Sequence, residues 1–356
     1  MGRTLELLQR LSESDGISGF EAGIGKVVEE EMRSAGAVVE VDRVGNRIAL
    51  LPGSEDGGRL LLTAHADEIG LIVRKVDRGG VLRFAAVGGI DPRVLPGQEV
   101  MVHGEKRLPG VIGSEPPHLQ LEEEKDRVVE IEDLFIDVGL TERTVRRRVK
   151  TGDPIALSRK FMEMEGGLCA AKAFDDRASL AALVLAVEEL ARRDHRWDIY
   201  AVATVQEEIA HLGATVSAYG LDPGLAVVLD VTYGDMLGVD KYETYELGGG
   251  PTLGVGPGYH PRLRARLMET AEREGIPIQD EAEPRPRGTD AAAIQLTREG
   301  VPTALVGIPV RYMHTSAEVV ATADVEGAAR LLVEFSAELV DVGFLLNPDS
   351  ITQDRA

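Results

Sequence analysis

Four short runs of small and apolar residues lie along the chain, and polar residues follow each of them closely. They occupy residues 60–64, 200–205, 224–229 and 303–308. Apolar residues at successive positions are typical of strands buried on both faces, as in a parallel sheet covered by helices. Helical patterns separate these runs, so the chain is predicted to have an α/β fold. Helices are expected at residues 5–11, 21–35, 178–193, 214–219, 261–274, 291–299 and 325–342.

Residues 70–165 show a different pattern. Short β-biased segments such as 71–76, 81–86 and 154–157 alternate there with turn-forming Gly and Pro residues. Strands of this length with regular turn signals predict a small β-barrel or sandwich. We therefore expect an inserted domain at 70–165 within a larger domain formed by 1–69 and 166–356.

The composition restricts the class of protein. A chain of 356 residues exceeds the usual size of a single core, which agrees with two domains. A net charge of −21 argues against nucleic acid and anionic membrane surfaces as partners. No apolar run approaches the roughly 18 residues of a membrane span, and the first residues lack the apolar centre of a signal peptide. With only one cysteine, Cys169, an internal disulfide framework is excluded, and we expect a cytoplasmic protein.

The run at 200–205 leads into two adjacent carboxylates, Glu207 and Glu208. Ligands and catalytic groups in open α/β sheets gather at the carboxyl ends of strands. Because neighbours on a strand point to opposite faces, the two residues are expected to have different roles. We assign Glu208 to a metal ion and Glu207 to proton transfer. The alternative is a strand end that is simply solvated.

Other ligand-type residues follow the remaining buried runs. His65 and Asp67 lie two apart on an extended segment and hence on the same side. A metal-binding histidine needs a hydrogen-bond partner that fixes its tautomer. Asp67 either contacts the imidazole of His65 in this role or holds the loop. Asp175 and Asp176 precede a helix, where one is expected to cap the helix end and the other is free to bind a cation. Asp230 ends the run at 224–229, and His314 follows the run at 303–308.

Together these residues form a mixed nitrogen and oxygen donor set. Two imidazoles and three carboxylates suit Zn²⁺, Co²⁺ or Mn²⁺ rather than Ca²⁺. Five ligands exceed what one ion with an open position needs, whereas two ions fit if one carboxylate bridges them. Such a centre lowers the pKa of a water and polarises a carbonyl. A nearby base, for which Glu207 is suited, is still needed to move protons. The set comprises His65, Asp175, Glu208, Asp230 and His314.

These segments resemble the motifs of the M42 family of metallo-aminopeptidases, which includes the tetrahedral, dodecameric (TET) aminopeptidases. The matching segments are His-Ala-Asp-Glu-Ile-Gly at 65–70, Ala-Phe-Asp-Asp-Arg at 173–177, Val-Gln-Glu-Glu at 205–208, Leu-Asp-Val-Thr at 229–232 and Arg-Tyr-Met-His-Thr at 311–315. Pro-Pro-His-Leu at 116–119 and Gly-Thr-Asp-Ala at 288–291 match as well. The resemblance extends from about residue 18 to beyond residue 314.

The resemblance implies a role for each residue. Asp175 would bridge two divalent ions, Zn²⁺ or Co²⁺ with Mn²⁺ as a further option. Glu208 and His314 would complete one metal site, and His65 and Asp230 the other. Glu207 would be the general base, and Asp67 the partner that orients His65.

The resemblance also implies the architecture and the assembly. It predicts a three-layer αβα metallopeptidase domain of the phosphorylase/hydrolase-like type, with a PDZ-like β-barrel inserted as a dimerisation domain. Peptides would be the substrates. Dimers of family members often assemble further into dodecamers.

Two positions depart from the family pattern, and other functions stay open. His211 lies in the loop Ala210 to Gly213, which lacks the Gly that relatives commonly have after the hydrophobic residue, so this loop is expected to differ. Ser179 replaces a residue that is often Gly. His211 is either a pocket residue or a plain loop side chain, and His118 is not assigned a role. A related dimetal deacylase or carboxypeptidase is the main alternative. A glycosidase fits less well, because it needs two facing carboxylates rather than two histidines. A non-catalytic shell protein is disfavoured because neither Glu207 nor any ligand is lost.

Overall fold

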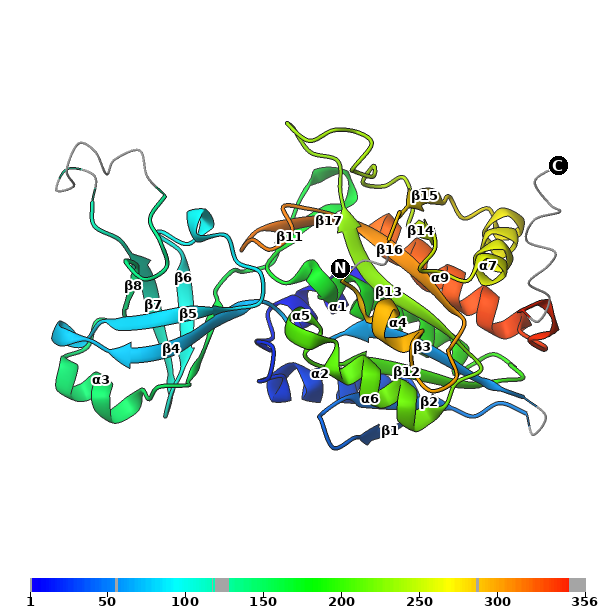
Figure 1. The fold of residues 1–356 in the computed structure, drawn as a ribbon, viewed down its shortest axis with the longest axis horizontal. Helices are drawn as coiled ribbons and strands as arrows, with labels where there is room; N and C mark the ends of the chain where they lie inside the picture. Colours follow the sequence, from blue (N-terminus) through cyan, green and yellow to red (C-terminus); the bar gives the residue numbers. More distant parts are fainter. Residues whose placement is uncertain (1, 55–56, 117, 119–127, 286–287, 346–356) are drawn as a thin grey trace.

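A computed structural model describes the chain apart from residues 1, 55–56, 117, 119–127, 286–287 and 346–356. The described residues form a large sheet covered by helices and a small barrel beside it (Figure 1). The α/β fold and the inserted barrel that the sequence predicts are both confirmed. The domain boundaries near residues 69 and 166 stay a prediction. No helix in the described part of the chain is both long and apolar enough to cross a membrane.

Eleven strands of the described residues form the main sheet. Its path is β1-β2-β12-β3-β13-β16-β17-β11-β10, with β14 paired to β16 and β15 paired to β14. The strands are β1 Val38–Val41, β2 Arg47–Leu51, β3 Arg59–His65, β10 Met162–Glu163, β11 Leu168–Ala171, β12 Asp198–Thr204, β13 Leu225–Tyr233, β14 Thr252–Val255, β15 Gln279–Ala282, β16 Thr303–Arg311 and β17 Glu318–Ala321. Adjacent pairs among β12, β3, β13 and β16 are parallel, so their carboxyl ends lie at one edge of the sheet.

Helices cover both faces of this sheet. They are α1 Arg3–Ser12, α2 Ala22–Ser34, α4 Phe174–Leu190, α5 Glu207–Ala210, α6 Leu212–Leu221, α7 Pro261–Glu274, α8 Asp290–Ile294 and α9 Thr322–Glu338. Alternate residues of the central strand β3 point to opposite faces. Leu60 and Leu62 pack in one core with α4 and α9, whereas Leu61 packs in another with α6 and α8. The sheet is therefore the middle of three layers.

The barrel is closed, with strand order β4-β5-β8-β7-β6-β9. Its elements are β4 Gly70–Val76, β5 Leu82–Val87, β6 Glu99–His103, β7 Arg107–Gly113, β8 Phe135–Asp137, α3 Glu142–Arg148 and β9 Pro154–Leu157. Short 3₁₀ turns occur at η1 Arg78–Gly80, η2 Pro92–Val94, η3 Glu165–Gly167 and η4 Gly343–Leu345. Val145 of α3 joins a core with Leu71 and Leu82, separate from the cores of the main sheet. Closure leaves no unpaired edge among the described strands of the barrel, where unwanted association could start.

Short elements account for the differences from the sequence prediction. The strands β8, β10, β11, β14, β15 and β17 are absent from that prediction, and the helix expected at 291–299 ends at Ile294. These strands form because they pair with segments far apart in the sequence. For example, β11 and β17 lie antiparallel, with Leu168 opposite Ala321. Local pattern carries no signal for such a contact.

Candidate metal centre

Ligand-type side chains meet at the carboxyl edge of the parallel strands. A cavity of about 470 Å³ opens there. His65 is the last residue of β3, and its strand neighbour across the sheet is Thr204, the last residue of β12. Asp230 lies on β13 opposite Gly307 of β16. The other contributors are Asp175 at the start of α4, Glu207 and Glu208 in α5, and His314 after β16.

Asp175 lies between the two histidines. Its Oδ1 atom is 3.0 Å from Nε2 of His65, and its Oδ2 atom is 3.2 Å from Nε2 of His314. Each carboxylate oxygen therefore faces a different imidazole. The two histidines, which are 249 positions apart in the printed numbering, belong to one site rather than to opposite sides of the molecule.

The surrounding donors divide into two groups that share Asp175. His65, Asp175 and Asp230 have ligand atoms within 4.8 Å of one another, as do Asp175, Glu208 and His314. Glu208 also lies 3.4 Å from His314, measured between Oε2 and Nε2. The other Glu208 oxygen, Oε1, is buried and accepts no hydrogen bond among the described residues. Mixed imidazole and carboxylate donors with an orphaned buried oxygen fit a pair of divalent ions.

Buried negative charge dominates the electrostatics of this centre. Burial raises the pKa of Glu208 to about 7, with the charge of Asp175 as the next cause. Burial also raises the pKa of Asp230 well above its usual range. Burial opposes the charged form of Asp175 as well, yet contacts with His314 and His65 hold its pKa low. Buried carboxylates at such separations need cationic partners, which divalent ions supply.

Main-chain carbonyls orient both imidazoles. Nδ1 of His65 lies 3.1 Å from the carbonyl oxygen of Asp67, and Nδ1 of His314 lies 2.7 Å from that of Gly89. A proton on each Nδ1 leaves each Nε2 free to act as a ligand. Gly89 follows β5, so the barrel part of the chain orients one of the two histidines.

The Asp67 side chain organises the neighbouring turn. Its Oδ1 atom accepts the N–H of Glu207 at 3.0 Å, and its Oδ2 atom accepts the N–H of Glu208 at 3.1 Å. The carboxylate is 3.5 Å from Nδ1 of His65, a contact longer than a hydrogen bond. Of the two possibilities considered from the sequence, Asp67 thus mainly holds the loop, while its carbonyl holds the ring.

The strand argument for Glu207 and Glu208 is wrong in its premise. Strand β12 ends at Thr204, and both residues lie in the one-turn helix α5 after Gln206, which has a left-handed backbone with φ 58°. The two carboxylates nevertheless diverge, because successive helical residues point in different directions. Glu208 contacts His314, whereas Glu207 Oε2 lies 3.8 Å from Nε2 of His65. Burial raises the pKa of Glu207.

The capping prediction for Asp175 and Asp176 is also wrong, because neither side chain caps α4. Asp176 is fully buried, and its Oδ2 atom accepts the N–H of His65 at 3.1 Å. Glu318 of β17, which the sequence reasoning missed, holds the site from the other side. Its two oxygens accept the N–H of Asp175 at 2.9 Å and that of His314 at 2.8 Å. A glutamate four residues after His314 is the signal that was available in the sequence.

A family model described as M42 glutamyl aminopeptidase matches residues 45–331. The chain belongs to the M42 peptidase family. The lysyl aminopeptidase of Pyrococcus furiosus is 36% identical over 344 residues, which cover 95% of this chain and 98% of that protein.

Solved M42-like structures agree with this family membership. A TET aminopeptidase from a marine sediment archaeon of the Thaumarchaeota superposes with a TM-score of 0.91 at 33% identity, covering 96% of this chain and 98% of the other. The Pyrococcus horikoshii TET1 peptidase, described as assembling into a tetrahedron or a large octahedral shell, gives 0.84 at 32% identity, covering 94% and 100%.

This M42 chain is therefore a metal-dependent aminopeptidase, as the sequence resemblance implies. The deacylase, carboxypeptidase and glycosidase alternatives are not favoured by these comparisons. Divalent metal ions follow from the family, and the model supplies two groups of ligand-type side chains for them.

The two unassigned histidines of this aminopeptidase have different surroundings. His211 lines the cavity, and Nδ1 lies 3.1 Å from Oε1 of Glu207. Contacts with Asp290 and Glu207 raise the pKa of His211 to about 10. His118 is exposed in a turn, and most of the segment after it lies outside the described residues.

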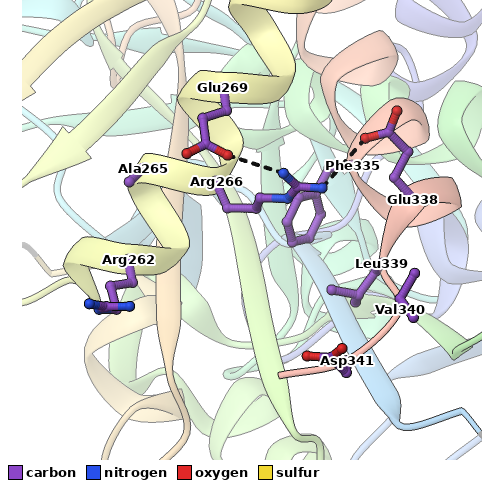
Figure 2. A pocket seen from close by; sticks show the side chains of 9 residues that line it. All are labelled: Arg262, Ala265, Arg266, Glu269, Phe335, Glu338, Leu339, Val340 and Asp341. Atoms are coloured by element: carbon purple, nitrogen blue, oxygen red, sulfur yellow. Dashed lines mark hydrogen bonds and ion pairs between the residues drawn. The ribbon is translucent and has the colours of Figure 1, made fainter. Parts of the chain in front are cut away.

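Another hollow of about 340 Å³ lies between α7 and the end of α9, and none of the proposed ligands lines it (Figure 2). Its central cation, Arg266, lies 3.1 Å from Glu269 and 3.8 Å from Glu338. Arg266 thus pairs with two of the three carboxylates of the lining, which contains no histidine or cysteine. This hollow therefore offers no counterpart to the metal centre.

Proposed function

We propose that the chain removes N-terminal residues from peptides with two divalent ions bridged by Asp175. The supporting observation is the position of that carboxylate, whose two oxygens face Nε2 of His65 and Nε2 of His314. Asp230 would complete the ligands of the first ion, and Glu208 those of the second. Zn²⁺ or Co²⁺ suits this donor set best, and Mn²⁺ also fits it.

The residues around the ions would divide the remaining work. When bound, the ion pair supplies polarisation of the scissile carbonyl and acidification of a water. Glu207, whose Oε2 atom lies beside His65, would accept the proton of the attacking water and pass it to the departing amine. Asp67 would keep Glu207 and Glu208 in place through their main-chain N–H groups. The carbonyls of Asp67 and Gly89 would keep both imidazoles in the ligating tautomer.

Metal removal and a Glu207→Gln variant test this proposal together. A chelator is expected to abolish cleavage of aminoacyl chromogenic substrates, and Zn²⁺ or Co²⁺ to restore it. Glu207→Gln is expected to keep both ions and lose about 10²–10⁴-fold in turnover, the usual contribution of a general base. Wild-type turnover by that variant at full metal occupancy would reject Glu207 as the base.

We also propose that the chain acts as a homo-oligomer, a dimer through the barrel or a dodecamer of such dimers. The TET1 peptidase of known shell-like assembly supports this, since 94% of the chain superposes on it. Light scattering should then give a mass near twelve times the 38.3 kDa of one chain for a dodecamer. For a dimer it should give twice the mass of one chain. A monomeric mass would contradict both.

A cytoplasmic location is proposed on the strength of the single cysteine.

A further inference from the structure

Three side chains outside the proposed ligand set converge beside the metal centre. Glu207, His211 and Asp290 have ligand atoms within 4.8 Å of one another. Nδ1 of His211 lies 3.1 Å from Oε1 of Glu207 and 3.7 Å from Oδ1 of Asp290. The three come from separate elements, namely the start of α5, the residue between α5 and α6, and the start of α8. The cluster therefore forms only in the folded chain.

One polar atom of each side chain faces the other two, and the Asp290 side chain is also held from behind. Thr204 donates from Oγ1 to Oδ2 of Asp290 at 2.5 Å, so Oδ1 is the atom that faces His211. The Asp290 side chain is 3% exposed, and its Oδ1 atom accepts no hydrogen bond from any described residue. Nδ1 of His211 is likewise buried without a hydrogen bond in the described part of the chain. The main-chain N–H of Glu207 donates to Oδ1 of Asp67, which fixes the backbone at this residue.

A proton on His211 satisfies this arrangement only in part. The distance of 3.7 Å to Asp290 is beyond hydrogen-bond range, so that carboxylate oxygen keeps no donor. The imidazole nitrogen lies 3.1 and 3.7 Å from the two carboxylate oxygens, and all three atoms lie within 4.8 Å of one another. These donor types and this spacing match instead the surroundings of a tetrahedral divalent ion. The cavity borders Glu207 and His211, which leaves a route for an ion and room for water as a fourth ligand.

We propose that Glu207, His211 and Asp290 form an additional divalent-metal site, whose occupancy inhibits the enzyme by withdrawing Glu207 from proton transfer. The inhibitory effect rests on the proposed role of Glu207 as base, whereas the site itself does not. A bound ion takes the lone pair of Nδ1, so His211 must release its proton first. Because of this competition, the site fills after the bridged pair, when metal is in excess.

Zinc titration of the whole enzyme tests the proposal. Wild type loaded with two ions per chain is dialysed against rising Zn²⁺, and bound metal per chain is measured beside turnover of an aminoacyl chromogenic substrate. We expect binding to rise from two ions to three and turnover to fall in parallel, toward the roughly 10²-fold loss expected when a base is removed. His211→Leu should keep two ions and lose both the third ion and most of the inhibition, expressed relative to its own turnover without excess metal. Asp290→Asn provides a second test of the same loss.

A histidine far from the centre controls for adventitious binding. His195, which lies 2.8 Å from the carbonyl of Trp197 before β12, is replaced by Gln in the control. This variant should bind the third ion and be inhibited as the wild type is. Equal third-ion binding in wild type and His211→Leu would overturn the site. Anomalous scattering can locate the third ion. If the ion binds at Glu207 and turnover does not fall, the site is upheld and the role of Glu207 as base is overturned.

Discussion

Replacing Asp67 with Asn tests how the centre is held together. The carboxylate is fully buried and accepts the N–H groups of Glu207 and Glu208, one on each oxygen. The contact with His65 is the main cause that lowers the pKa of Asp67 despite burial, so the group is ionised. Asn keeps a similar shape, but an amide has only one accepting oxygen. Its NH₂ group would face a main-chain N–H, with two donors opposed.

The size of the effect follows from these contacts. Hydrogen bonds to a charged group contribute about 1.5–3 kcal/mol each, and the variant loses at least one of them. An outer partner of a metal site typically accounts for about 10–100-fold in metal affinity. The turn that moves carries the proposed base Glu207 as well as the ligand Glu208. A displacement of about 1 Å in such a group costs about 100-fold in rate, so turnover should fall even at saturating metal.

Asp324 offers a matched control for this experiment. It is also fully buried, and its two oxygens accept the N–H groups of Gly250 and Gly248, each at 2.8 Å. Asp324→Asn should therefore lower the apparent melting temperature about as much as Asp67→Asn. Only Asp67→Asn should also lower metal affinity, measured against a chromogenic chelator, and turnover of metal-saturated enzyme. Wild-type affinity and turnover in Asp67→Asn would refute the reasoning.

Three other outcomes are expected. Asp175→Asn should reduce bound metal below two ions per chain by elemental analysis, since both groups of donors share this residue; retention of two ions would contradict the bridging role. Leu183→Ala, in the fully buried face of α4, should cost about 2–5 kcal/mol of unfolding free energy in denaturant titration, and a cost below about 1 kcal/mol would contradict this. Gly213→Ala should cost about 1–3 kcal/mol by overpacking, because the added methyl overlaps main-chain atoms of Val205; an unchanged unfolding midpoint would contradict that clash.

Much of the main fold is predictable from the sequence because its central strands are buried on both faces. The run at 60–64 becomes the central strand β3, and the predicted helix at 261–274 coincides with α7. These elements have strong local patterns. The short strand β17 does not, although it carries Glu318, which contacts the main chain of Asp175 and His314. Its position depends on pairing with β16 and β11, which lie elsewhere in the chain.

The metal centre, like the fold, has some features that local sequence predicts and others that depend on contacts between distant segments. The residue types and their places after buried strands indicate a metal centre, and the family motifs indicate which residues share an ion. The sequence reasoning nevertheless placed Glu207 and Glu208 on a strand, because nothing local shows that Gln206 turns into a left-handed conformation. It also left His211 undecided. Only the packing of α8 against α6, which directly follows His211, brings Asp290 to within 3.7 Å of that imidazole.

The sequence by itself determined the kind of chemistry, since imidazoles and carboxylates at strand ends have the same ligand properties in any fold. It also determined the layered sheet, because apolar periodicity is a local property that each segment carries with it. The tertiary structure alone decided which oxygen faces which imidazole, and that Gly89 of the barrel part orients His314. Those outcomes depend on ångström-scale distances between segments far apart in the chain, and such distances are set by packing of the whole molecule.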